Sequence, residues 1–142
     1  MPDKPNSEAR IALLNDMLAD VFAPMIQAMN ITPIEITGDG ARFEVPQNAD
    51  IVRGGDIICG QAIAAIADTV GVLALSAHNA PAREMTTVDM TTHFTRPLFL
   101  GPLDITASIV SNGRRMATVR IEARQKGEEK IGAVSTCAYA YV

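Results

Sequence analysis

The stretch that most constrains the fold of this chain is Cys59–Ala77, CGQAIAAIADTVGVLALSA. After Gly60 it consists almost entirely of apolar or small residues, without the alternation of a strand. It is too long for one strand, so it predicts a helix of about four to five turns. A surface helix carries a polar stripe, and this segment has none. We therefore expect other parts of the fold to cover the helix nearly all round.

One carboxylate, Asp68, lies near the middle of this apolar helix. An unpaired buried charge costs several kcal/mol, so Asp68 either bonds to backbone or a partner helix as a structural residue, or carries a function. A membrane span needs about 20 mostly apolar residues. The uninterrupted apolar runs here are shorter, the carboxylate is central and no basic flank follows, which argues against a span.

Composition predicts a single globular domain over residues 1–142, with 48% hydrophobic and 20% charged residues. The net charge of −4 and the lack of a basic run argue against a nucleic-acid partner. Two cysteines, Cys59 and Cys137, without a visible secretory segment predict reduced thiols in a cytoplasmic protein. The two histidines, His78 and His93, have no ligand spacing, so we expect no metal and no cofactor.

The rest of the chain predicts a short helical extension and a sheet. Residues 1–30 form the extension, with a helix from Ser7 to about Asp20 and a break at Pro24. Six segments then alternate as strands do: 31–37, 41–45, 86–95, 103–109, 117–124 and 131–142. The first two are joined by a predicted turn at Asp39-Gly40, and 46–56 is a predicted loop.

These elements predict an α+β fold in which an antiparallel sheet wraps around the long helix. Six strands cover only part of such a helix, so we expect a second copy of the chain to complete its burial. Along 86–95, alternation places Thr86, Val88 and Met90 on one face, and Thr87 and Asp89 on the other. Asp89 is expected to be structural.

Two motifs carry a family resemblance. The first is Asn48…Arg53-Gly-Gly-Asp-Ile-Ile-Cys-Gly-Gln…Ala67-Asp68-Thr69, and the second is Thr87-Val-Asp-Met…Phe94-Thr-Arg-Pro97. Over roughly residues 35–142 the chain resembles hot-dog-fold acyl-CoA thioesterases of the phenylacetate-degradation (PaaI-like) type. The family helix typically opens with His-Gly-Gly, where this chain has Cys59-Gly60-Gln61. Arg53-Gly54-Gly55 looks like the turn that opens the helix in some branches.

The resemblance implies roles for three catalytic residues. Gly60 matches the helix-start glycine whose N–H binds the thioester oxygen, as the free amides of a helix N-terminus can do. Asp68 matches the carboxylate that activates water or attacks the thioester, and Thr87 matches the hydroxyl that orients the water. Without the resemblance, Gly60 would be a plain cap and Thr87 an ordinary strand residue.

The resemblance also implies a set of substrate-binding residues. These are Arg53, Gly54, Gly55, Cys59, Gln61, Arg96, Arg114 and Arg115. Arg96, Arg114 and Arg115 are candidates for the CoA phosphates, because arginine binds phosphate well. The alternative for Arg114 and Arg115 is a solvated charge on a turn.

The expected function is hydrolysis of an acyl-CoA thioester by a homodimer or a dimer of dimers. One alternative is a hydratase or dehydratase, which would use a histidine on or before the helix, and residues 1–77 contain none. The other is a non-catalytic acyl-CoA-binding protein, which would gain stability by losing Asp68. The sequence does not specify the acyl group. Gly60 and Asp68 are eight residues apart on one helix, about 12 Å, so we expect each site to combine two chains.

Overall fold

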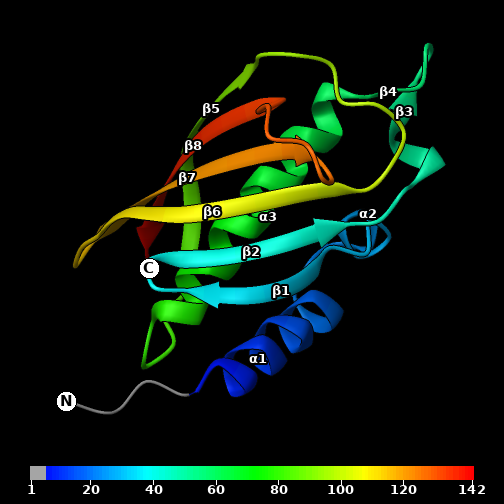
Figure 1. The fold of residues 1–142 in the computed structure, drawn as a ribbon. Helices are drawn as coiled ribbons and strands as arrows, with labels where there is room; N and C mark the ends of the chain where they lie inside the picture. The colour runs from blue at the N-terminus through cyan, green and yellow to red at the C-terminus, as the bar shows by residue number, and fades with distance from the viewer. Residues whose placement is uncertain (1–5) are drawn as a thin grey trace.

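The computed structural model describes residues 6–142, and Figure 1 shows their arrangement. The helices are α1 (Ser7–Asp20), α2 (Pro24–Gln27) and α3 (Gly60–His78), with a 3₁₀ turn, η1, at Ala49–Ile51. The strands are β1 (Thr32–Thr37), β2 (Gly40–Val45), β3 (Val52–Arg53), β4 (Ile57–Ile58), β5 (Met85–Phe94), β6 (Leu103–Asn112), β7 (Met116–Gln125) and β8 (Ala133–Tyr141). The expected long helix and six main strands are confirmed.

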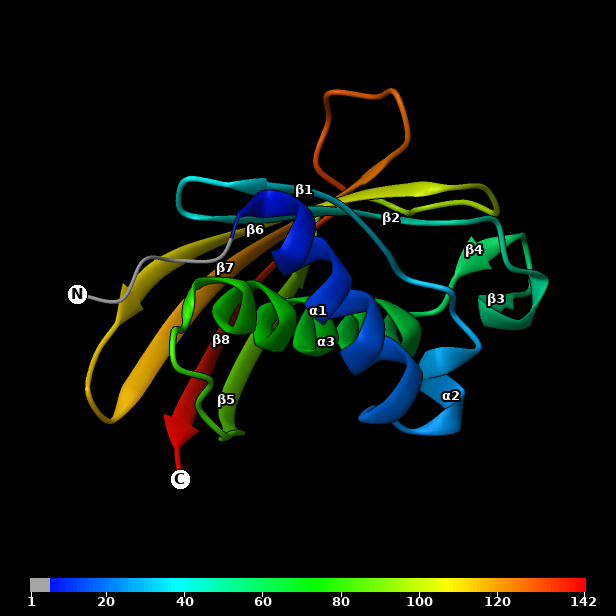
Figure 2. The ribbon, with the colours of Figure 1, turned by 90° about the horizontal axis from the view of Figure 1, so that it is seen from below.

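Six strands form one antiparallel sheet in the order β1-β2-β6-β7-β8-β5, which curves around α3 (Figure 1). Figure 2 shows α1 beside α3 on the concave face of this sheet. Strand side chains alternate between the two faces, so β2, β6, β7 and β8 each send every second residue toward the helix. The core consists of these inward residues and the covered side of α3, and the predicted hot-dog arrangement is confirmed.

The N-terminal extension follows the prediction from Asn6 onward, and residues 1–5 lie outside the described residues. Asn6 caps α1, because its side chain accepts a hydrogen bond from the Ala9 amide at 2.8 Å. Leu14 is fully buried, and Pro24 begins α2 after the predicted break. The extension thus packs a helix against β1 and α3.

One side of α3 is not covered, which corrects the expectation of burial all round. Ala65, Asp68, Val72 and Ser76 are half-buried and Gln61 is exposed. They recur every three or four positions and form an open stripe along the helix. By length and apolarity α3 could cross a membrane, but 61% of its most apolar window is buried in this fold, as in the core helix of a globular domain.

Two turns differ from the prediction. The first hairpin turns at Gly38-Asp39, one residue earlier than expected, and Gly40 begins β2. Gly40 is needed inside the strand, since a side chain there would collide with the Ala107 carbonyl of β6. The predicted loop 46–56 also contains η1 and the first strand of the small β3–β4 hairpin.

A β-bulge at Val88 changes the expected faces of β5. Thr87 pairs with Tyr139 of β8, whereas Asp89 pairs with Ala138, the residue directly before Tyr139. Val88 therefore has no partner on β8. Tyr139 is buried against α3 and Ala138 faces outward. Thr87 therefore lies on the helix side of the sheet and Asp89 on the outer side, which corrects the shared face predicted for them.

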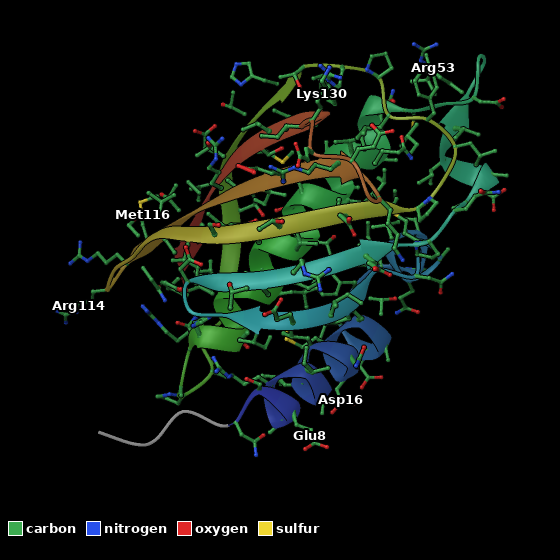
Figure 3. The ribbon with its side chains drawn as sticks, in the orientation of Figure 1. Glu8, Asp16, Arg53, Arg114, Met116 and Lys130 are labelled. Carbon is green, nitrogen blue, oxygen red and sulfur yellow. The ribbon has the colours of Figure 1, made fainter. Side chains whose placement is uncertain are left out.

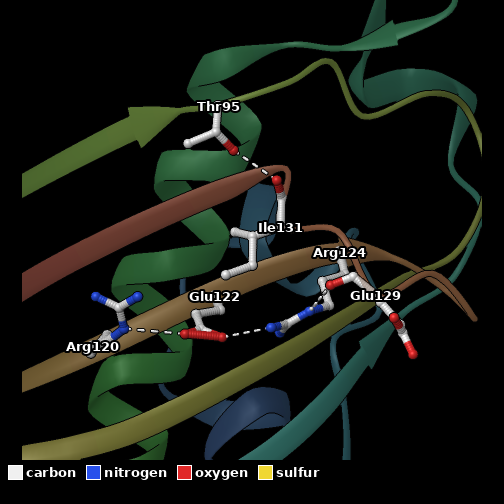
Figure 4. A network of polar contacts seen from close by, with 6 residues as sticks. All are labelled: Thr95, Arg120, Glu122, Arg124, Glu129 and Ile131. Carbon is white, nitrogen blue, oxygen red and sulfur yellow. Dashed lines mark hydrogen bonds and ion pairs between the residues drawn. The ribbon is translucent and has the colours of Figure 1, made fainter.

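Figure 4 shows polar contacts just after β5 and along β7. The Thr95 hydroxyl donates to the Ile131 carbonyl at 2.7 Å. Glu122 lies between Arg124 at 2.8 Å and Arg120 at 3.1 Å. Burial raises the pKa of the Glu122 carboxyl, but the two arginines together outweigh it and leave that pKa below its usual value.

Candidate active site

The N-terminus of α3 presents free amides. Cys59 is the N-cap residue, and its carbonyl accepts from the amides of Ala62 and Ile63. Within residues 6–142, no hydrogen bond from the Gly60 or Gln61 amide to a protein acceptor is present. The 19-residue helix adds its positive dipole end at the same place. This terminus can bind the oxygen of a polarised carbonyl.

An open groove of about 370 Å³ begins at Gly60. Its lining includes Phe94 and two arginines, Arg53 and Arg96. A side chain at position 60 would meet the Phe94 ring at 3.3 Å, so glycine leaves this end of the groove open. Neither arginine forms an ion pair with a carboxylate in residues 6–142, and their charges remain available for an anion. Figure 3 shows Arg53 at the outer edge of the fold.

The β3–β4 hairpin places Arg53 in this groove. Its turn contains Gly54 and Gly55 and ends at Asp56. Gly55 has φ +84° and Asp56 has φ +57°, so both residues lie in the left-handed region. Glycine adopts this conformation without a steric penalty, which favours glycine at position 55. The predicted Arg-Gly-Gly segment is thus a turn that carries the arginine, and the glycines themselves do not line the groove.

Asp68 and Thr87 form a polar pair in the middle of the open stripe. The Thr87 hydroxyl donates to Asp68 Oδ1 at 2.7 Å. The bulge at Val88 makes this contact, because it turns Thr87 to the helix side of β5. A half-buried carboxylate with one oxygen held by a hydroxyl can accept a proton from water or attack an acyl carbon.

Tyr139 of β8 fixes the position of this pair. Its hydroxyl donates to the Asp68 carbonyl at 3.0 Å, and its backbone lies opposite Thr87. Burial is the main cause that raises the pKa of Tyr139, which keeps the hydroxyl protonated as a donor. Gly71 makes room for it, since a side chain there would overlap the Tyr139 hydroxyl. A glycine in the middle of a helix is a sequence signal for close packing, here between the helix backbone at Gly71 and the Tyr139 hydroxyl.

The structure places the remaining predicted residues elsewhere. Cys59 and Gln61 line a second hollow on the other side of Gly60. Arg114 lies at the far end of the sheet from Arg53 (Figure 3), in the β6–β7 turn together with Arg115. The roles of Arg114 and Arg115 stay a prediction.

The histidines and the second cysteine lie away from this groove. His78 Nε2 bonds to the Gly40 carbonyl at 2.9 Å, and His93 is exposed opposite the outward-facing Val134. Burial raises the pKa of the Cys137 thiol to about 11, so this thiol is a poor nucleophile at neutral pH. In residues 6–142 no group of three His, Cys, Asp or Glu side chains could hold a metal ion.

Four residues near the site escaped the sequence prediction: Phe94, Tyr139, Met25 and Met29. Phe94 is part of the second family motif but was given no role, and its proximity to Gly60 depends on how β5 crosses α3. The two methionines belong to the extension and approach α3 only through the fold. Apart from Gly71, which marks Tyr139, no local pattern identifies these contacts.

Residues 56–131, more than half of the chain, match the Thioesterase superfamily. A predicted esterase of Thermoplasma acidophilum is 33% identical over 88 residues, which cover 62% of this chain and 66% of that protein, slightly under two thirds of its length. A thioesterase of Haemophilus influenzae has the same fold, with a TM-score of 0.82 at 20% identity, covering 93% of this chain and 90% of that one. The PaaI protein of the Escherichia coli phenylacetic acid degradation operon gives 0.80 at 18% identity and 94% coverage of both chains. The chain belongs to the Thioesterase superfamily.

Proposed function

We propose that the protein hydrolyses acyl-CoA thioesters at sites shared between two subunits. The observation that carries the proposal is the position of two half-sites on the open side of one helix. Free amides lie at Gly60, and the Asp68–Thr87 pair lies eight residues later, about 12 Å along the axis. One thioester group must be within about 3 Å of both an oxyanion donor and the attacking group. A single chain does not provide both.

A second copy supplies the missing half. In residues 6–142 no strand pairs with the outer edge of β5, which runs along the open stripe of α3. Antiparallel pairing of two β5 edges would set two α3 helices side by side in opposite directions. Gly60 of one subunit then approaches Asp68 of the other, and a twofold axis creates two such sites.

The reaction follows from these groups. The Gly60 amide hydrogen-bonds the thioester oxygen and stabilises the negative charge that develops on it. Asp68 removes a proton from water as the water oxygen bonds to the acyl carbon, or attacks that carbon directly and is freed by water in a second step. In both routes the C–S bond breaks, CoA leaves as the thiol after proton transfer, and the acyl group becomes a free acid. Thr87 holds Asp68 in position and can orient the water.

Arg53 and Arg96 support CoA as the thiol carrier. They line the groove that opens at Gly60, where two guanidinium groups without an ion pair in residues 6–142 can bind phosphate. Arg114 and Arg115 lie in the β6–β7 turn, at the opposite end of the sheet in the same subunit. A role for them at this site therefore requires that the second subunit provide them.

Two inactive variants test the shared site. Asp68→Asn removes the carboxylate, and Gly60→Val blocks the oxyanion position. The exposed Phe94 ring can move to accept the valine, so we expect folded protein. Each variant alone should release free thiol from a panel of acyl-CoAs at least about 100-fold more slowly than wild type. After co-refolding, random pairing makes about half of the dimers heterodimers, each with one intact site, so activity should return to roughly a quarter of wild type.

Two results contradict the proposal in different ways. If each variant is inactive alone and the mixture stays inactive, the two residues act within one chain. If wild type releases no thiol from any acyl-CoA but binds CoA esters, the protein is a binding module and not a hydrolase.

A further inference from the structure

A second hollow, of about 330 Å³, lies on the other side of the α3 N-terminus from the arginine groove. It lies between α2 with the residues that follow it, η1 and the first turn of α3, and it is open to solvent on one side. Its apolar walls are Met25, Ala28, Met29, Ile51, Cys59 and Ala62. Asp50 is the one charged residue among its lining, and it is exposed. The hollow therefore suits an apolar ligand.

The hollow adjoins the proposed oxyanion site along the sequence. Cys59 and Gln61 line the hollow, Gly60 lies between them, and Gly60 lines the arginine groove. A thioester whose oxygen is bound at Gly60 thus has an apolar hollow on one side and a cationic groove on the other. This polarity matches a molecule with an apolar acyl group at one end and phosphates at the other.

The walls of the hollow are held together across three elements. The Asn48 side chain donates to the Ala28 carbonyl at 3.4 Å, which joins the start of η1 to the end of α2. The Cys59 amide donates to the Ile51 carbonyl at 2.9 Å, which joins η1 to the start of α3. Met29 and Ala62 are almost completely buried. The hollow is thus built into the fold and is not a gap between loose segments.

We propose that this hollow binds the acyl group and selects an apolar group of medium size, such as octanoyl, over acetyl. The proposal rests on the proposed function and names its substrate class. A volume of about 330 Å³ is far larger than acetyl requires, and an apolar wall disfavours charged acyl groups such as malonyl. Three of the six apolar wall residues, Met25, Ala28 and Met29, belong to the N-terminal extension and lie outside the region that matches the family, so the extension would set the selectivity.

The test compares kcat/KM for acetyl-, octanoyl- and palmitoyl-CoA in wild type and Ala28→Phe. Ala28 is exposed and has helical backbone angles, φ −66° and ψ −16°, so phenylalanine fits without backbone strain. The ring would occupy the hollow, and the octanoyl-to-acetyl ratio should fall at least about tenfold, as expected when a few methylene groups lose their contacts. Met25→Ala widens the opening and should shift the preference toward palmitoyl-CoA.

Ala19→Phe is the matched control. Ala19 lies on α1 and lines a different hollow, with Leu18 and Gln27, so this ring should leave the ratio unchanged. If wild type prefers acetyl-CoA, or if hydrolysis continues in Ala28→Phe and Met25→Ala with the wild-type ratio, the acyl-pocket proposal is wrong and the hydrolase proposal stands. If Ala28→Phe does not fold, Met25→Ala decides, since Met25 is 65% exposed. If wild type hydrolyses no acyl-CoA, both proposals fall.

Discussion

The two edges of the sheet differ in almost every respect that controls edge-to-edge pairing. β1 is six residues long, carries Pro33, which has no amide proton, has a bulge at Ile34, and is covered by α1. β5 is ten residues long, has no proline, and exposes Val88 and Met90. Short strands, prolines, bulges and covering helices are the devices by which proteins block an edge.

The difference shows that β1 ends the sheet, whereas β5 is available to continue it. β5 also has a bulge, but this one orients Thr87 toward Asp68 and leaves the following residues in regular register with β8. A long strand edge that is exposed in a single chain and carries exposed apolar side chains invites pairing with another strand. The predictions below therefore compare each change on the β5 side with a matched change on the β1 side.

The largest effect is expected for Asp68→Asn, matched by Glu35→Gln on β1. Loss of a positioned proton acceptor should lower kcat at least about 100-fold, while KM changes little. The melting temperature should stay the same or rise, because a functional carboxylate is rarely optimal for stability. Glu35 forms only an exposed pair with Arg42 at 3.5 Å, so Glu35→Gln should leave both quantities unchanged. Full activity in folded Asp68→Asn would place the chemistry elsewhere.

An intermediate effect is expected for Met90→Asp, matched by Ile34→Asp on β1. The two side chains are similarly exposed, at 37% and 38%. A carboxylate at position 90 would be buried without a partner in the proposed dimer, so sedimentation should show association weakened at least about tenfold. Ile34→Asp should leave association unchanged. Equal behaviour of the two variants would remove β5 from the interface.

The smallest effect is expected for Arg96→Ala, matched by Arg42→Ala. Loss of one phosphate contact at an exposed arginine should raise KM for an acyl-CoA about fivefold, but not KM for the pantetheine ester of the same acid. Arg42 of β2 lies near the covered edge and should affect neither substrate. A rise in KM that is equal for both substrates would exclude a role for Arg96 in binding the nucleotide part.

The sequence was sufficient for the fold because its signals are long and periodic. The uninterrupted apolar run of α3 and the period-two strands on both sides of it admit few other arrangements. Phe43, Val45, Val119 and Ile121 are buried as their alternation predicts. The turn before Gly40 was misplaced by one residue because the tight contact with Ala107 is nonlocal and leaves no local signal.

The site was only partly predictable, for a similar reason. The helix and its preceding turn place Gly60 and Arg53 together over a short stretch of chain, and the family resemblance indicated both. The pair of Asp68 with Thr87 depends on the bulge at Val88, which alternation cannot reveal. The apolar hollow joins Met25 with Ala62, far apart in the sequence, and only the packed structure brings them together.

The extra residue at Val88 has a consequence for how this strand tolerates changes in length. Substitutions at Val88 should have little effect on the fold of one chain, since its side chain is half exposed and pairs with no residue of β8. Deletion of Val88 would be severe, because one part of β5 would then have to turn over. Either the residues up to Thr87 would turn and carry the Thr87 hydroxyl to the outer face of the sheet, or the residues from Asp89 onward would exchange their faces. In a comparison of related sequences, a one-residue gap at this position would therefore matter more than any exchange of side chain. The number of residues in β5 is itself a functional property of the chain.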